Sequence, residues 1–191
     1  MIRGVIFDMD GTLTVPRIDF QALRRELGIM AGDIVDYIKS ADERERKRVE
    51  AILHRFEEDA AINAELQCGT RELLDALRAR GIKLGLLTRN SRKSVATVMQ
   101  KFRLAFDTTL TREDAAHKPS PEPVLRLARK WGLAPAEMLV VGDYIHDIRS
   151  GRSAGSKTAL LVNDRVPEWA AEADHTIHRL DELLKIIEKI P

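Results

Sequence analysis

The sequence predicts an α/β fold with a doubly wound, mostly parallel sheet, into which a small all-helical cap is inserted after the first strand. From residue 69 onward, short apolar runs alternate with segments of helical periodicity. Strands separated by helices form parallel sheets through right-handed crossovers, which place helices on both faces. Residues 15–68 interrupt this alternation, because they contain no strand-like run. Polar side chains follow several of the expected strands, where ligands bind in Rossmann-like sheets.

The α/β core is expected to comprise residues 1–14 and 69–191. Its first strand is the apolar run that begins at Val5. Apolar residues at helical spacing predict a helix over residues 71–80, and Gly81 supplies the stop signal. The remaining core elements are expected to be strands at residues 82–87, 106–110, 138–141, 158–162 and 175–177, and helices at residues 91–102, 121–131, 145–153 and 180–190.

The cap is expected to comprise residues 15–68, with helices over residues 19–27, 33–39 and 42–66. Gly28 ends the first of these helices. The charged run at the start of the third helix interleaves both signs four residues apart. This pattern is typical of a solvated helix face, which we favour over a basic grip on a partner. Two linkers are expected to tether the cap, Thr14–Arg17 and Gln67–Thr70.

The composition describes an ordinary globular protein with a substantial core. The chain has 191 residues, of which 44% are hydrophobic and 32% charged. A net charge of +1 gives no electrostatic reason to expect a nucleic acid or a membrane surface as a partner. The single cysteine, Cys68, excludes an internal disulfide and is expected to be a small buried hydrophobic residue. No apolar stretch approaches the ~20 residues of a membrane span. Because the chain starts directly with a strand, we expect a cytoplasmic protein.

The most informative segment is the end of the first strand. Asp8 and Asp10 are two residues apart in an extended chain, so their side chains are expected to face one cavity. Two carboxylates at that range repel each other and raise each other's pKa. A divalent cation would resolve this conflict, and so would one proton shared by the pair. Gly11 allows the chain to turn sharply directly after the acids.

Three further strand ends carry polar groups. Thr88-Arg89-Asn90 follows the second strand and precedes a helix, so it is either a phosphate site or an ordinary helix cap. Lys118 follows the third strand on a loop that its neighbouring prolines stiffen, where it supplies a positive charge. Asp143 and Asp147 follow the fourth strand, four residues apart at the start of a helix. Because parallel strands end at one edge of a sheet, we expect these groups to share a site.

These motifs, in this order, resemble those of the haloacid dehalogenase superfamily, in its phosphoglycolate-phosphatase-like branch with a helical cap. Asp8-Met9-Asp10-Gly11-Thr12-Leu13 resembles the first motif of the superfamily and Thr88 the second. Lys118 with Pro119 resembles the third motif, and residues 142–147 resemble the fourth. Each motif alone is weak evidence, but the ordered set covers nearly the whole chain.

The resemblance implies a nucleophile and an acid–base group. Asp8 would attack phosphorus to form an aspartyl-phosphate. Asp10 would protonate the leaving oxygen and then deprotonate the water that cleaves this intermediate. The dehalogenases of the superfamily lack this second acid, so Asp10 disfavours dehalogenation.

The resemblance also implies Mg²⁺ as the cofactor. Asp8, the backbone carbonyl of Asp10, and Asp143 would hold the ion. Asp147, the fourth expected residue of the metal site, would orient Lys118 or a metal-bound water.

The remaining candidates concern the substrate. The resemblance implies that Thr88 and Lys118 hold the phosphoryl oxygens, and Arg89 and Asn90 are further candidates for substrate binding. Arg89 stands where the family often has a small residue or Asn, so it either adds a phosphate contact or points away. Tyr144 and His146, beside the acids, either line the pocket or pack. The cap offers further candidates for recognition or for plain helix surface: Arg17, Asp19, Arg24, Tyr37 and Lys39.

We therefore expect a Mg²⁺-dependent phosphatase that acts on a small phosphorylated metabolite, such as phosphoglycolate or a sugar phosphate. One alternative is a phosphomutase or phosphotransferase of the same superfamily, which needs a second phosphate grip on the cap. Another is a non-catalytic binding module that uses the cap as a partner surface; a degenerate member would lack an acid or the lysine, and none is missing. We expect a monomer or weak homodimer, with neither nucleic acid nor membrane as a partner.

Overall fold

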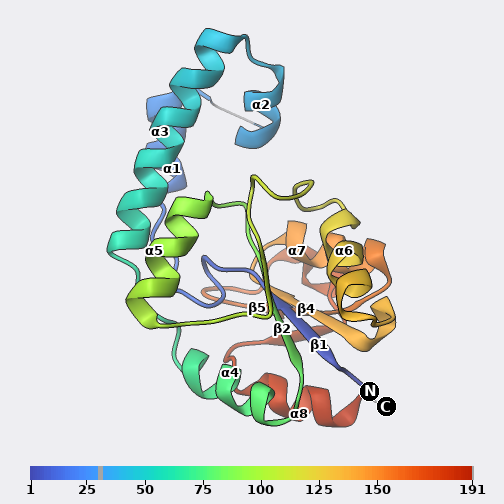
Figure 1. The fold of residues 1–191 in the computed structure, drawn as a ribbon. Coiled ribbons are helices and arrows are strands. Elements are labelled where there is room, and N and C mark those ends of the chain that lie inside the picture. The colour runs from blue at the N-terminus through green and yellow to red at the C-terminus, as the bar shows by residue number, and fades with distance from the viewer. Residues whose placement is uncertain (30–31, 191) are drawn as a thin grey trace.

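The computed structural model of the chain describes residues 1–29 and 32–190. Its six-stranded sheet has the order β3-β2-β1-β4-β5-β6, and every strand pair is parallel (Figure 1). This is the doubly wound Rossmann-type order, so the predicted fold class is confirmed. The strands are β1 (Gly4–Phe7), β2 (Lys83–Leu87), β3 (Thr108–Leu110), β4 (Met138–Gly142), β5 (Lys157–Leu161) and β6 (His175–Ile177).

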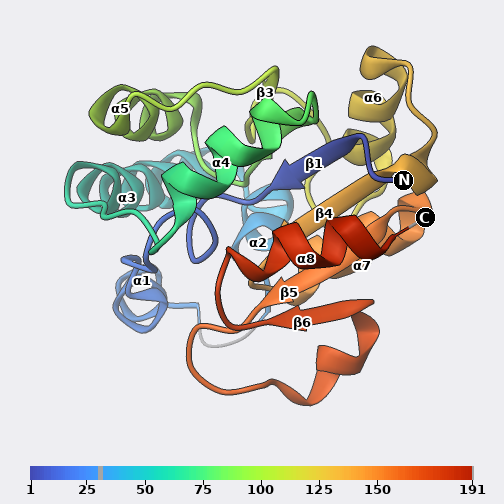
Figure 2. The same ribbon diagram turned by 90° about the horizontal axis from the view of Figure 1, so that it is seen from below.

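Helices cover both faces of the sheet. One face packs against α4 (Thr70–Ala79), α5 (Arg92–Phe102) and α8 (Glu182–Lys189). The other face packs against α6 (Glu122–Trp131) and α7 (Ile145–Ala154). Figure 2 shows α4 and α8 side by side over the first face. Two short 3₁₀ helices, Pro135–Glu137 and Glu168–Glu172, lie in the connections and were not predicted.

The strand β1 shows why the sheet has two cores. Val5 and Phe7 join the cluster under α4, α5 and α8, whereas Ile6 joins the cluster under α6. Successive residues of a strand point to opposite faces of the sheet. Because helices cover both faces, all three side chains are buried. The strand is therefore apolar throughout, as expected for the centre of a parallel sheet.

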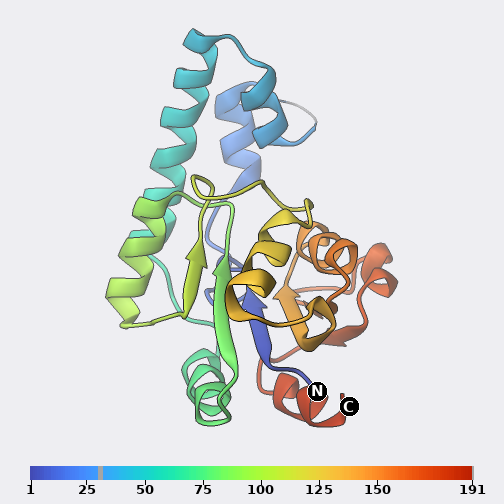
Figure 3. The same cartoon turned by 45° about the vertical axis from the view of Figure 1, so that its right-hand side comes forward.

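The helical segment between β1 and α4 has a small core of its own. It contains α1 (Phe20–Leu27), α2 (Ile34–Ser40) and α3 (Glu43–Ile62), and it lies beyond the carboxyl ends of the strands (Figure 3). We keep the name cap for residues 15–68, whose boundaries remain a prediction. The buried residues of this core are Leu23, Leu27, Ile29, Ile34, Val49 and Leu53.

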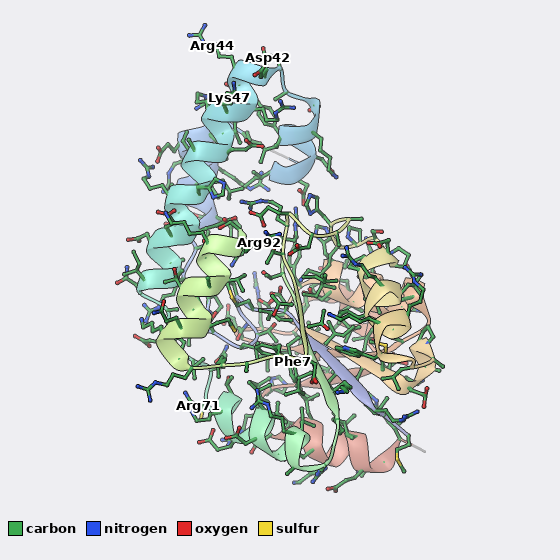
Figure 4. The ribbon with its side chains drawn as sticks, in the orientation of Figure 1. Phe7, Asp42, Arg44, Lys47, Arg71 and Arg92 are labelled. Atoms are coloured by element: carbon green, nitrogen blue, oxygen red, sulfur yellow. The ribbon has the colours of Figure 1, made fainter. Side chains whose placement is uncertain are left out.

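The charged run of α3 is exposed at the tip of the cap. Figure 4 places Asp42, Arg44 and Lys47 at the end of the cap farthest from Phe7. Asp42 is the N-cap of α3, since its side chain accepts a hydrogen bond from the backbone N–H of Glu45. Lys47 pairs with Glu43 one turn away, at 2.7 Å. These contacts are those of a solvated helix face, the interpretation that the charge pattern favoured.

Two expectations were wrong, one about the end of the third cap helix and one about the burial of Cys68. The third cap helix ends at Ile62, four residues before the expected Leu66. Leu66 instead forms an antiparallel bridge with Thr14, so the segments that enter and leave the cap hydrogen-bond to each other. Cys68 is exposed rather than buried, because it lies in the segment that leaves the cap, outside the core clusters.

Among the described residues, no helix is long and apolar enough to span a bilayer.

The first prediction concerns the packing of α6 on the sheet. A Cβ at Gly85 would lie 2.9 Å from the Cη2 atom of Trp131, whose ring nitrogen donates a hydrogen bond to Thr108. Because the ring is rigid and held in place, Gly85→Ala should lower the free energy of unfolding by about 1–3 kcal/mol. Urea unfolding followed by circular dichroism measures this loss.

The matched background is Trp131→Phe, which removes the ring atoms that the added methyl group would meet. We expect Gly85→Ala to cost less stability in that background than in the natural chain. An equal loss in both backgrounds would show that the contact with Trp131 is not the cause.

Candidate active site

A cavity of about 540 Å³ lies between the carboxyl edge of the sheet and the cap. It borders the ends of β1 and β4, where the strand order reverses; ligands bind at such switch points. Its lining includes the residues of the core that the sequence predicted for catalysis, the metal and the phosphoryl group: Asp8, Asp10, Thr88, Arg89, Asn90, Lys118, Asp143 and Asp147.

Lys118 is buried at the floor of the cavity, where it joins three separate segments. Its ammonium lies 2.6 Å from Oδ1 of Asp8 and 2.5 Å from Oδ1 of Asp147. It also donates to the backbone carbonyl of Leu87, at 2.9 Å. These bonds use the three donors that an ammonium has. Lys118 therefore screens two acids, and its ammonium is not left free to face the cavity.

Three carboxylates converge beside this lysine with the chemistry of a hard-metal site. One oxygen each of Asp8, Asp143 and Asp147 lies within 4.8 Å of the other two. Two oxygens on opposite sides of one Mg²⁺ are about 4.2 Å apart, at roughly 2.1 Å per bond. The separation is thus within a small side-chain adjustment of one ion, and carboxylate oxygens are the ligands that Mg²⁺ prefers. The donor set fits the predicted metal.

The acids hold protons more tightly than ordinary carboxyl groups do. Burial, together with the charges of Asp147 and Asp10, raises the pKa of Asp8 to about 7 although Lys118 opposes the rise. Burial and the charges of Asp8 and Asp147 raise the pKa of Asp143 to about 8. Burial lowers the pKa of Lys118, but Asp147 and Asp8 outweigh this effect and raise it above its usual value. The site is therefore short of positive charge.

Asp10 lies in the same cavity but outside the carboxylate cluster. Its Oδ1 accepts a hydrogen bond from the Thr14 hydroxyl at 3.1 Å, and its Oδ2 accepts one from the Asn90 amide. Burial raises the pKa of Asp10, while these two hydrogen bonds oppose the rise. A carboxyl group held in this way is oriented for proton transfer. Thr14 was not predicted as part of the site.

The segment after β2 both begins α5 and contributes side chains to the cavity. The Thr88 hydroxyl accepts a hydrogen bond from the backbone N–H of Asn90, at 3.2 Å. The Asn90 side chain is turned toward Asp10, as described above. The Ser91 side chain accepts from the backbone N–H of Ser94, so Ser91 is the predicted N-cap of α5. The segment thus caps a helix and also lines the cavity.

Arg89 links the core to the cap, which the sequence did not reveal. Its Nη2 donates to Oδ1 of Asp33 in the cap at 2.6 Å, and its Nη1 lies 2.8 Å from Nδ1 of His146. All three residues line the cavity. Arg89 therefore neither points away nor is committed to a phosphate; it is paired with a cap carboxylate. His146 and its neighbour Tyr144 are both cavity residues.

A second ion pair joins the cap to the core. Glu57 of α3 is buried, and its Oε1 accepts a hydrogen bond from Nη1 of Arg112 at 2.5 Å. Arg112 also donates to the backbone carbonyl of Arg89. Both partners line the cavity, so the cap and the core meet along its wall. Glu57 and Arg112 are separated by 55 residues, and no local pattern indicated their pairing.

Asn163 supports the loop that carries the first acids. Its side-chain amide donates to the backbone carbonyl of Gly11 at 2.7 Å and to Oδ2 of Asp143 at 3.3 Å. It also accepts from the side chain of Gln67 in the linker, at 2.6 Å. Asn163 follows β5 closely, so the strand-end rule that identified the other groups could have found it.

Of the five cap candidates, only Arg24 lines the cavity. Asp19 caps α1, since it accepts from the backbone N–H of Ala22. Arg17 pairs with Glu65, and Lys39 with Asp36. Tyr37 donates a hydrogen bond to Glu45.

Comparison with known proteins gives the family. Residues 14–161 match the haloacid dehalogenase-like hydrolases, and the chain belongs to this family. The chain is 31% identical to an N-acetylmuramic acid 6-phosphate phosphatase of Pseudomonas putida, over 98% of this chain and 96% of that protein. The predicted resemblance is confirmed, as is the expectation of a hydrolase with phosphatases among its relatives.

Solved structures agree on the fold. A hydrolase from Pseudomonas syringae superposes with a TM-score of 0.84 at 22% identity, over 98% of this chain and 99% of that one. A protein from Haemophilus somnus, described as a predicted phosphoglycolate phosphatase, superposes with a TM-score of 0.76 at 23% identity, over 97% of each chain. At this level of identity the likeness concerns the fold alone.

The second prediction follows from the raised pKa values of Asp8, about 7, and Asp143, about 8. Between the ordinary carboxyl pKa and these raised values, the folded, metal-free protein binds more protons than the unfolded chain does. Its free energy of unfolding therefore falls as the pH rises through this range, until both groups are ionised. Mg²⁺ needs the ionised carboxylates and competes with these protons. At about pH 8.5, Mg²⁺ at a hundredfold excess over its Kd should therefore stabilise the protein by about 2.7 kcal/mol, and the same Mg²⁺ concentration should stabilise it less at about pH 6.

Urea unfolding with Mg²⁺ and with EDTA, at both pH values, measures this effect. Asp143→Asn should remove most of the Mg²⁺ stabilisation. The matched control is Asp164→Asn, an exposed Asp outside the cavity, which should keep it. Equal stabilisation of both variants by Mg²⁺ would exclude Asp143 as a ligand.

Proposed function

We propose that the protein is a Mg²⁺-dependent phosphomonoesterase that hydrolyses a small phosphorylated metabolite through an aspartyl-phosphate on Asp8. The observation that carries this proposal is the convergence of Asp8, Asp143 and Asp147 around Lys118 at the switch point of the sheet. With Asp10 included and all groups ionised, the formal charge is −3. A phosphoryl dianion could not enter such a site without added positive charge.

Mg²⁺ would supply that charge. Asp8, Asp143 and the backbone carbonyl of Asp10 would hold the ion, with Asp147 beside it. When bound, it would offset the negative charge of the transferring phosphoryl group and of the acids that surround it. Asn163 would keep Asp143 in place, since it hydrogen-bonds to both this carboxylate and the loop at Gly11.

The chain's own residues would perform two half-reactions. In the first, a carboxylate oxygen of Asp8 would attack phosphorus, the ester P–O bond would break, and Asp10 would give its proton to the leaving oxygen. In the second, Asp10 would take a proton from water, whose oxygen would attack phosphorus and break the bond to Asp8. Burial raises the pKa of Asp10, and the hydrogen bonds from Asn90 and Thr14 hold its carboxyl group in one orientation, which supports both proton transfers.

Other residues would position the phosphoryl group. Thr88 lines the cavity after β2 and would bind a phosphoryl oxygen, while the charge of Lys118 stays beside the transferring group. Arg89 and Asn90 would shape the same wall: Asn90 through its bond to Asp10, and Arg89 through its pair with Asp33 of the cap. The cap would exclude bulk water during attack.

The substrates of related proteins give a first test panel. It contains N-acetylmuramic acid 6-phosphate and 2-phosphoglycolate, each with Mg²⁺ or EDTA. A phosphatase releases inorganic phosphate, whereas a mutase returns an isomer with little free phosphate. We also propose that the enzyme acts in the cytoplasm, as a monomer or weak homodimer.

The third prediction concerns Asp8. Asp8→Asn removes the attacking carboxylate, so kcat for phosphate release should fall on the order of 10⁴-fold or more. Asp164→Asn is the matched exposed control and should retain kcat. The measurement is Mg²⁺-dependent phosphate release by the purified proteins on the panel. Equal rates for the natural chain and Asp8→Asn would contradict the mechanism, and a lack of turnover with Mg²⁺ on a broad panel of phosphate esters would favour a binding module.

A further inference from the structure

The cavity is larger than a minimal substrate needs. Its volume of about 540 Å³ corresponds to about eighteen molecules of liquid water, at ~30 Å³ each. The leaving group of 2-phosphoglycolate has only about five non-hydrogen atoms and would leave most of this space to solvent. The structure therefore has room for a much larger leaving group.

The roof of the cavity is apolar and belongs to the cap. In contrast to the acidic floor, most of the cap residues that line the cavity are hydrophobic. They are Pro16, Ile18, Phe20, Ile34 and Leu53. Phe20 is 57% exposed, so its ring is largely uncovered by protein. An apolar part of a substrate would bury such surface favourably.

The charged cap residues that line the cavity differ in whether a side chain of the core pairs with them. Asp33 is paired with Arg89, and Glu57 with Arg112, so their charges are already balanced by the core. Arg24 is the only cation that the described part of the cap contributes to this lining. Its Nη2 donates to the backbone carbonyl of Gly32 at 2.6 Å. Its Nη1 is shielded from water and has no hydrogen-bond partner among the described residues.

An unpaired guanidinium N–H is costly when water cannot reach it. Because Arg24 lines the cavity, a turn of its side chain would bring this N–H to an acceptor oxygen of a bound substrate, and a carboxylate would suit it best because it matches the charge and the planar geometry of arginine. Arg24 belongs to the cap among the apolar roof residues, whereas the phosphoryl group would lie at the floor beside Asp8, so this acceptor would be on the leaving group.

We propose that Arg24 determines specificity, and that the substrate is a phosphate monoester whose leaving group has an apolar body bearing a carboxylate. This inference rests on the proposed phosphatase function and names the class of substrate for the same site. The body packs against the roof of the cap, and the carboxylate binds the guanidinium of Arg24.

Two aryl esters test this directly, 4-carboxyphenyl phosphate and phenyl phosphate. They share an apolar ring and differ in one carboxylate at the end opposite the phosphate. The measured quantity is the ratio of kcat/KM for the first ester to that for the second. The natural enzyme should favour the carboxylate ester, and Arg24→Met should lower the ratio at least tenfold, mostly through KM.

Two further variants keep the result decisive. Arg24→Gln removes the charge but keeps an amide donor, and it should also lower the ratio if Arg24→Met fails to fold. Arg25→Met, on an exposed neighbour of the same helix that does not line the cavity, should leave the ratio unchanged. The variants' folding is checked by thermal unfolding.

The outcomes separate the two proposals. If the natural enzyme hydrolyses the esters but shows no preference, or keeps its preference in the Arg24 variants, the assignment of Arg24 is overturned while the phosphatase function stands. If it hydrolyses neither these esters nor the metabolite panel with Mg²⁺, the proposed function fails, and the inference fails with it.

Discussion

The structure of the site depends on how the charge of its clustered acids is balanced. Asp8 and Asp147 converge because the ammonium of Lys118 lies between them and hydrogen-bonds to both. Asp143 lies in the same cluster, but the three N–H donors of Lys118 are used by other groups. Burial and the charges of Asp8 and Asp147 raise the pKa of Asp143 to about 8. One lysine cannot balance three clustered carboxylates, so the protein alone leaves an excess of negative charge. A divalent cation is the simplest way to balance this charge, and it would also reduce the electrostatic repulsion of an anionic substrate.

Contacts with the core hold the cap in position over this site. The pair Arg89–Asp33 and the buried pair Glu57–Arg112 join the two parts along the cavity wall, while the hydrogen-bonded linkers at Thr14 and Leu66 join them at its base. Breaking a buried pair leaves an uncompensated charge, which is strongly destabilising. The cap is therefore held at several points rather than by flexible linkers alone. In the proposed function, its roof would present a defined surface to the leaving group, and the residues of the floor would perform the chemistry.

Much of this could be predicted from the sequence, because the signals are local. The alternation of apolar runs with helical periodicity gives the order of the elements, and the strand-end rule brings Asp8, Lys118 and Asp143 to one edge of the sheet. The contacts that could not be predicted join residues far apart in the chain. Nothing local indicates that Arg89 binds Asp33 or that Leu66 leaves its helix to pair with Thr14. These contacts depend on where the cap lies over the sheet, which helical periodicity does not encode.

The most direct test of this account is to locate the metal. A crystal grown with Mn²⁺, which binds the same oxygen ligands and has a measurable anomalous signal, reports the position of the ion directly. The account predicts one anomalous peak in the cavity, bonded to carboxylate oxygens of both Asp8 and Asp143, with Lys118 still beside Asp147. An ion bound to neither of these two acids, or a cavity without any peak at saturating Mn²⁺, would contradict it.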